Sequence, residues 1–342
     1  MAKAAQRHAD DLREALRLAV CATTGVTEIV EAMHRRIGSG AGVLGQPLAV
    51  PARVVTKIAY GNVRFVTRLV GAVGDRVLRE LEPLLGESVS GPERDAVVAV
   101  LNGVFGDWLR ETGSPLALEL VLRREGAGSK ALVLVHGSSM NDRQWERRGH
   151  DHGSALARDG GFTPVYVRYN SGLSIAENGR LLAGRLDDLD EVQELAILGH
   201  SMGGLVARSA CHAAELEGRP WRKKLRSLVT LGTPHAGAPL ERYGSLLEAL
   251  LPISSYSAPL ARLGRIRSAG ITDMRYGLHL PLPAGVECHA IAAGKDRLVP
   301  VASAHGAFPP AHCSIVPGAS HLDLLSSLDA YETIRRALSA LC

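Results

Sequence analysis

The sequence predicts an α/β fold in which a mostly parallel sheet has helices on both faces. From about residue 121 onward, short runs rich in Val, Ile and Leu alternate with stretches of helical periodicity, which is the pattern of repeated βαβ units. The runs are continuously apolar, as strands are when helices cover both faces of their sheet. Before this point, apolar residues recur at helical spacing and strand patterns are poor.

The expected elements of the sheet follow in order along the chain. Strands are expected at ALVLVHG (131–137), TPVYVRY (163–169), LAILGH (195–200), LRSLVTLG (225–232), VECHAIAAG (286–294) and HCSIVPG (312–318). Helices are expected at 152–159, 174–188, 203–216 and 323–340. Between the fourth and fifth strands, the leucine-rich segment 238–283 is longer than a simple connection. We therefore expect a lid or cap insertion there, over the C-terminal ends of the strands.

We divide the chain into a helical N-terminal extension at 1–120 and an α/β domain at 121–342. The extension has helical patterns at 9–37, 52–82 and 92–110. The helix at 52–82 has an apolar stripe and a basic face, formed by Arg53, Lys57, Arg64 and Arg68. Two interpretations stay open: a helix packed on the α/β domain with a solvated basic face, or an amphipathic helix in peripheral contact with an anionic lipid surface.

Composition excludes several classes of protein. The net charge is +4 and aromatic residues make up 4% of the chain, which argues against a nucleic-acid partner. The five cysteines are odd in number and form no CxxC pair, so neither a disulfide framework nor a zinc site is expected, and a reducing compartment fits best. No signal peptide or long apolar span is apparent, which predicts a cytoplasmic protein.

The motif GHSMGG at 199–204 carries the chemistry. It is a G-x-S-x-G pattern placed directly between an expected strand and an expected helix, where a sharp turn would present the Ser201 hydroxyl to a substrate. Small residues are needed two positions before and after the serine, and Gly199 and Gly203 meet that need. The following helix would point its N-terminal N–H groups at a developing oxyanion.

Four motifs in the same order resemble those of the α/β-hydrolase family. LVLVHGSS (132–139) resembles the family's oxyanion loop, GHSMGG the nucleophile elbow, AAGKDRLVP (292–300) the strand end that carries the acid, and PGASHLDLL (317–325) the histidine loop. LGTPHAGAPL (231–240) is similar to bacterial lipases and esterases, including the GPI inositol-deacylase-like lipase group. The resemblance covers about 121–342 and implies the α/β-hydrolase fold. No family is recognised for 1–120.

The resemblance implies a triad of Ser201, Asp296 and His321, in the chain order of that fold. His321 would take the proton of Ser201, and Asp296 would orient the imidazole. The oxyanion hole would use the N–H of Met202 and that of Ser138, with Ser139 as the alternative. Asp273 and Asp323 are the competitors for the acid. His305 and His312 are the competitors for the base.

The other histidines have structural explanations from their place in the sequence. His136 is expected to shape its loop, His200 to point away from the reacting centre and pack under the elbow, and His235 either to border the pocket or to pack in its loop. HDHG at 150–153 lacks a third metal ligand and is expected to be a hydrated surface turn. No glycine-rich stretch has phosphate-loop spacing after a strand, so neither metal nor cofactor is expected.

These patterns predict a serine hydrolase that cleaves carboxylic esters through an acyl-enzyme. Resemblance and the leucines of 238–283 favour lipid-like or acyl esters. Alternatives are another acyl hydrolase (a polyester depolymerase, thioesterase or amidase) and a non-catalytic protein that docks on a membrane or partner. The sequence leaves the oligomeric state undetermined.

Overall fold

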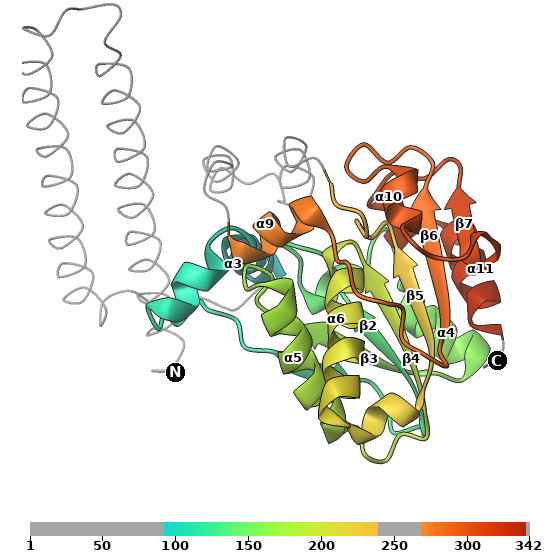
Figure 1. Ribbon diagram of the computed structural model, residues 1–342, viewed down its shortest axis with the longest axis horizontal. Coiled ribbons are helices and arrows are strands. Elements are labelled where there is room, and N and C mark those ends of the chain that lie inside the picture. The colour runs from blue at the N-terminus through green and yellow to red at the C-terminus, as the bar shows by residue number, and fades with distance from the viewer. Residues whose placement is uncertain (1–91, 239–267, 340–342) are drawn as a thin grey trace, which may run out of the picture. The chain divides into compact units, whose positions relative to one another are not determined.

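The computed structural model describes residues 92–238 and 268–339 (Figure 1). The chain divides into two compact units, Met1–Ser90 and Gly91–Cys342. The helices expected at 9–37 and 52–82, with the basic face of the latter, lie outside the described residues, as does most of the expected insertion at 238–283.

A seven-stranded sheet forms the centre of the second unit, with the order β1-β3-β2-β4-β5-β6-β7. The strands are β1 (Val121–Arg124), β2 (Lys130–Val135), β3 (Thr163–Arg168), β4 (Glu194–His200), β5 (Leu225–Leu231), β6 (Glu287–Ala293) and β7 (Cys313–Val316). β1 runs antiparallel to β3, and all other neighbours are parallel. The mostly parallel sheet, and with it the predicted α/β-hydrolase fold, is confirmed.

The register of the strands brings the chemically interesting loops to one edge. Val135 pairs with Gly199, so the loop after β2 lies beside the turn after β4. His200 pairs with Leu231, and Ala293 pairs with Val316. Because parallel strands end at the same edge, the segments that follow β2, β4, β6 and β7 all emerge there.

Helices cover both faces of the sheet (Figure 1). On one face, α5 (Ile175–Arg185) packs against α6 (Met202–Glu217). On the other, α4 (His152–Gly160) and α11 (Leu328–Ala337) are joined by a hydrogen bond from Tyr331 to Asp159. The central strands are consequently inaccessible to solvent: residues 131–135 of β2 are each 0% exposed. This burial explains the continuous apolar runs in the sequence.

Helix α3 (Pro92–Glu111) confirms the helix expected at 92–110, but it packs within the α/β unit. Its backbone approaches the loop after β3, where Asn170 donates a hydrogen bond from Nδ2 to the carbonyl of Gly106 at 2.8 Å. Near its middle, Ser268 Oγ donates to the carbonyl of Gly103 at 2.6 Å. Residues 91–120, which the sequence grouped with the N-terminal extension, therefore lie in the second unit.

Other elements differ from expectation for local reasons. The helix expected at 323–340 is split into a 3₁₀ turn at Asp323–Leu325 and α11, because Ser327 caps a new helix by accepting the N–H of Ala330. Strand β1 was not predicted, since it is short and only partly buried. The helix expected at 174–188 is formed by α5 followed by a 3₁₀ turn at Leu186–Asp188. The unpredicted short helices are α9 (Ala269–Tyr276), α10 (Val301–His305) and 3₁₀ turns at Asp142–Trp145, Pro220–Lys223 and Pro310–His312.

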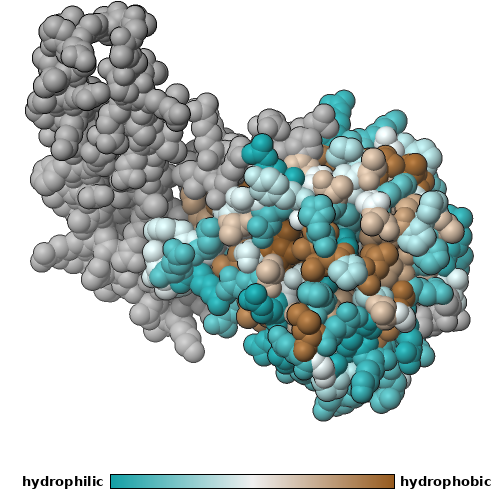
Figure 2. Space-filling model, viewed as in Figure 1, coloured by the Kyte–Doolittle hydropathy of each residue, from teal (hydrophilic) through white to brown (hydrophobic). Residues whose placement is uncertain are grey.

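The described surface is uneven in hydropathy. On the face shown in Figure 2, hydrophobic residues gather towards the middle of the view, near α9, whereas the lower part over α5 and α6 is mostly hydrophilic. Among the residues that the structure describes, no helix is both long and apolar enough to cross a membrane.

Replacing Gly172 by Ala should destabilise the unit, because α3 leaves no room beside this residue. A Cβ at Gly172 would lie 2.2 Å from the carbonyl oxygen of Asn102 and 2.5 Å from the nitrogen of Gly106, and both are backbone atoms. We expect urea unfolding to show a loss of about 1–3 kcal/mol. Gly184→Ala is the control, since its Cβ would meet nothing nearer than 3.8 Å. Equal stability of the two variants would contradict this packing argument.

Candidate active site

The turn between β4 and α6 holds Ser201 in a strained conformation. Ser201 has φ 52° and ψ −126°, and it is one of three described residues other than glycine with positive φ. Such a conformation costs on the order of 1–3 kcal/mol and needs surrounding structure to hold it. The Ser201 N–H donates to the carbonyl of Leu231 on β5 at 2.8 Å, which anchors the turn to the neighbouring strand. The G-x-S-x-G motif therefore forms the predicted strand–turn–helix.

The glycines of the motif are required by contact distances. A Cβ at Gly203 would lie 2.1 Å from the carbonyl oxygen of Val135 on β2, and one at Gly199 would lie 2.6 Å from the Cα of Gly204. Both distances are shorter than real Cβ contacts. The first turn of α6 thus lies directly against the end of β2, so the N–H groups at the start of α6 point to the edge where the loops gather.

His321 and Asp296, which lie 25 residues apart in the chain, are in direct contact. The Nδ1 of His321 lies 2.7 Å from Oδ2 of Asp296. The other carboxylate oxygen of Asp296 accepts the N–H of Leu298 at 2.8 Å and that of Val299 at 2.9 Å. These two bonds fix the orientation of the carboxylate. Because Oδ2 can only accept, Nδ1 of His321 is the ring nitrogen that carries a hydrogen.

The second ring nitrogen of His321 remains available. Nε2 is buried and has no hydrogen-bond partner among the described residues. The ring lies near the elbow, since its centroid is 4.9 Å from that of His200, the residue before Ser201. A Cβ at Gly232, which follows the Leu231 carbonyl bonded by Ser201, would lie 3.1 Å from Nδ1 of His321. A base nitrogen without a partner, on a ring that lies close to the residue before Ser201, is suited to proton transfer. Catalytic hydrogen bonds are often long before substrate binds.

The loop after β2 supplies the other side of the site. The Cβ position of Gly137 lies 3.1 Å from Cβ of Ser201, so the loop and the elbow are in contact. Ser138 and Ser139 are both buried. The N–H of Ser139, the alternative oxyanion donor, donates to Oγ of Ser171 at 2.9 Å. Ser139 itself has φ 60°, so this loop is strained as well.

An ion pair that the sequence did not single out underlies this loop. Asp142 is 1% exposed and accepts hydrogen bonds from Nε of Arg168 at 2.5 Å and Nε of Arg123 at 2.8 Å. Burial raises the pKa of Asp142, but the two arginines outweigh burial and hold it below its ordinary value. The pairing of β1 with β3 brings these two arginines together. Because the two strands are distant in the sequence, no local pattern predicts the cluster of Asp142, Arg123 and Arg168.

The competitors proposed for the triad have other partners. Asp273 accepts the N–H of Ile175 at 2.9 Å, at the start of α5. Asp323 bonds Ser320 and Arg148. His305 contacts the carbonyl of Ser314, and His312 that of Cys288. None of these bonds includes Ser201.

His136 and His235 are buried and pack in their loops. His136 stacks on Tyr169 with ring centroids 4.3 Å apart, and the hydroxyl of Tyr169 donates to its carbonyl at 2.8 Å. His235 lies between Arg208, 3.0 Å from Nδ1, and the hydroxyl of Thr230, 3.1 Å from Nε2. Of the two expectations for His235, the contacts therefore support packing.

The HDHG segment differs from the hydrated turn that we expected. Asp151 caps α4 by accepting the N–H of Ser154 at 2.7 Å, and His152 is 0% exposed. Burial occurs because the helix begins here and its first turn packs under the histidine loop, where Nε2 of His152 lies 2.8 Å from the carbonyl oxygen of Leu324. No metal-binding group of His, Cys, Asp or Glu occurs in the part of the chain that the structure describes.

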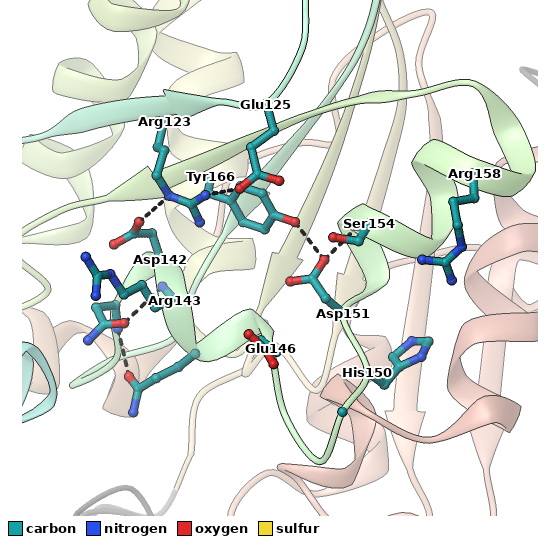
Figure 3. Close-up of a pocket in the computed structure, with 13 residues that line it drawn as sticks. Arg123, Glu125, Asp142, Arg143, Glu146, His150, Asp151, Ser154, Arg158 and Tyr166 are labelled. Carbon is teal, nitrogen blue, oxygen red and sulfur yellow. Dashed lines mark hydrogen bonds and ion pairs between the residues drawn. The ribbon is translucent and has the colours of Figure 1, made fainter. Parts of the chain in front are cut away.

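A polar groove of about 840 Å³ lies beside this segment, away from the triad (Figure 3). In this view Asp151, Ser154, Arg158 and His150 lie on the right of the groove, and Arg123, Asp142 and Arg143 lie on the left. The lining has both signs of charge, and Arg123 there is already paired with Asp142 and Glu125. Its residues do not include Ser201, Asp296 or His321.

One family model matches part of the chain. Residues 181–272 match the family model described as a PGAP1-like alpha/beta domain. A comparison with curated protein sequences gives no match.

Solved structures similar to this chain are hydrolases by their names. The lipase BlEst2 of Bacillus licheniformis, in its mature form, is 15% identical, with 65% of this chain and 98% of that chain covered and a TM-score of 0.47. An esterase from a marine microorganism has the same identity and TM-score, with coverages of 65% and 99%. The type II thioesterase BorB, from the borrelidin biosynthetic cluster, is 19% identical, with coverages of 64% and 96% and a TM-score of 0.44.

The buried histidines predict a pH-dependent stability. Burial lowers the pKa of His136 and of His152 to about 4, and burial with the charge of Arg208 lowers that of His235 to about 3. The unfolded chain takes up these protons below about pH 6.5, whereas the folded protein does not. The free energy of unfolding is therefore highest above that pH and falls as the pH decreases towards 4.

Urea unfolding at pH 7, 6 and 5 measures this effect. Each histidine should contribute a slope that increases below pH 6.5 and approaches about 1.4 kcal/mol per pH unit near pH 5. His235→Gln should remove one such contribution, and the slope should flatten accordingly. A free energy of unfolding that stays constant between pH 7 and 5 would contradict the neutral, buried state of these side chains.

Proposed function

We propose that the protein is a serine hydrolase that cleaves carboxylic esters through an acyl-enzyme. The observation that carries the proposal is the His321–Asp296 contact of 2.7 Å beside a strained serine turn, with the opposite nitrogen of the imidazole unpartnered among the described residues. The fold supports it only as a scaffold, since unrelated activities share one fold.

In this mechanism Ser201 attacks the ester carbonyl while Nε2 of His321 accepts the hydroxyl proton. Asp296 keeps the hydrogen on Nδ1 and stabilises the imidazolium that forms. The proton then passes from Nε2 to the leaving alkoxide, and the acyl group remains on Oγ. Water, deprotonated by the same nitrogen, releases the acid and restores the serine.

The oxyanion of the tetrahedral intermediate would accept hydrogen bonds from the N–H groups of Met202 and Ser138. Met202 is the first residue of α6, so its N–H is one of those with no partner inside the helix. The positive end of the helix dipole adds to this stabilisation. The site requires no cofactor in this scheme.

The substrate class proposed is lipid-like or acyl esters. Its support is the composition of 238–283, which includes Leu240, Leu246, Leu247, Leu250, Leu251, Ile253, Leu260 and Leu263. Apolar side chains that line an acyl pocket favour long acyl groups over charged ones.

Removing any member of the triad should abolish turnover of p-nitrophenyl esters. Ser201→Ala, Asp296→Asn and His321→Ala should each lower kcat by about 10⁴ or more. Ser201→Ala should also prevent covalent labelling by a fluorophosphonate probe. Asp273→Asn is the matched control for the acid. Asp273 accepts a backbone N–H, that of Ile175, so this variant should retain kcat. A fully active His321→Ala protein would end this assignment.

The acyl preference is tested with p-nitrophenyl esters from acetate to palmitate, together with the matched acyl thioesters and anilides. We expect kcat/KM to rise with chain length over the shorter esters, because each buried methylene contributes about 0.8 kcal/mol. An equal rate for all chain lengths would contradict the lipid-like substrate. Faster turnover of thioesters or anilides would assign the site to the corresponding hydrolase instead.

A further inference from the structure

The loop that carries His321 is held by two other histidines from different parts of the fold. His200, at the end of β4, has Nε2 at 3.2 Å from the main-chain oxygen of His321. His152, at the start of α4, has Nε2 at 2.8 Å from the main-chain oxygen of Leu324. Both side chains are 0% exposed. Two contacts of the same kind, one from the end of β4 and one from the start of α4, thus converge on four consecutive residues.

The partners of these imidazoles fix where their hydrogens lie. A carbonyl oxygen only accepts, so Nε2 must carry the hydrogen in both rings. In His152, Nδ1 then accepts from Nε2 of His150 at 2.9 Å. In His200, Nδ1 is buried without a partner among the described residues, and a Cβ at Gly137 would lie 3.1 Å from it. Burial lowers the pKa of His200 well below its usual value, so this ring stays neutral.

The His200 hydrogen bond connects the residue next to the nucleophile directly to the backbone of the base. His200 precedes Ser201, and its ring bonds the backbone of His321 itself. Asp296 fixes the other end of the His321 side chain by bonding Nδ1. The imidazole of His321 is therefore held at its main chain by His200 and at its ring by Asp296, while His152 holds the following turn.

Resting on the proposed function, we propose that His200 and His152 are positioning residues that set the distance between the His321 imidazole and Ser201. They contact no reacting atom. Their N–H groups hold the backbone of the histidine loop in a fixed position. A displacement of about 1 Å at a catalytic group is enough to lower the rate about 10²-fold.

The test compares side chains of nearly equal shape that differ in whether they donate a hydrogen bond. His200→Gln and His152→Gln retain a donor, whereas His200→Met and His152→Met do not. In the full-length protein we expect each Met variant to lower kcat on p-nitrophenyl butyrate by roughly ten- to hundredfold, with KM within about twofold. The Gln variants should recover most of that loss. Fluorophosphonate labelling of Ser201 should slow in parallel.

His305→Met and His305→Gln form the matched control pair. The Nε2 of His305 lies 3.1 Å from the carbonyl oxygen of Ser314 on β7, so the same kind of bond is removed outside the histidine loop at 317–325. Both control variants should retain kcat. Thermal unfolding confirms that each variant is folded, and the two independent sites keep the test decisive if one Met variant does not fold.

A spectroscopic measurement separates this inference from the proposed function. Long-range ¹H–¹⁵N spectra at pH 6 should show His200 and His152 as neutral Nε2–H tautomers, assigned by the signals missing from each Gln variant. Met and Gln variants with equal kcat, or either ring as an Nδ1–H tautomer or an imidazolium, would overturn the inference. A wild-type protein inert to esters and to fluorophosphonate would instead refute the proposed function.

Discussion

The absence of space around the turn at Ser201 is the constraint on which the rest of the site depends. Gly203 lies against the carbonyl of Val135, and Gly199 against Gly204, at distances that exclude a Cβ atom on either side. Within this turn the serine has a positive φ, a conformation that persists only where the surrounding structure holds it. The same contact brings the start of α6 to the end of β2, so one constraint places both the hydroxyl and the N–H groups proposed to receive the oxyanion.

Around this fixed turn, the remaining groups are arranged by neutral and charged hydrogen bonds of different kinds. The carboxylate of Asp296 is held by two backbone N–H groups and in turn holds His321. The loop of His321 is held at its carbonyl oxygens by buried imidazoles. Neutral donors suit that second task, because a buried imidazolium would carry an unpaired charge in a region that excludes water.

Close backbone contacts also make α3 part of this unit. Its backbone lies close enough to the loops after β2 and β3 that a Cβ at Gly103 would lie 1.9 Å from Oγ of Ser139. A helix that sequence composition assigned to a separate extension therefore braces the loop proposed to form the oxyanion hole. The boundary between the two compact units falls instead after Ser90.

The sequence by itself determined the class of the fold, its six parallel strands and the serine turn, because these follow from local patterns: continuous apolar runs, and glycines at fixed offsets from Ser201. The contact between His321 and Asp296 was anticipated only by resemblance. The burial of His152, the ion pairs of Asp142 and the bond from His200 to His321 were decided by tertiary structure alone. They join residues from strands and helices distant in the chain, and nothing in a residue's neighbours along the sequence records which side chain the folded sheet will place against it.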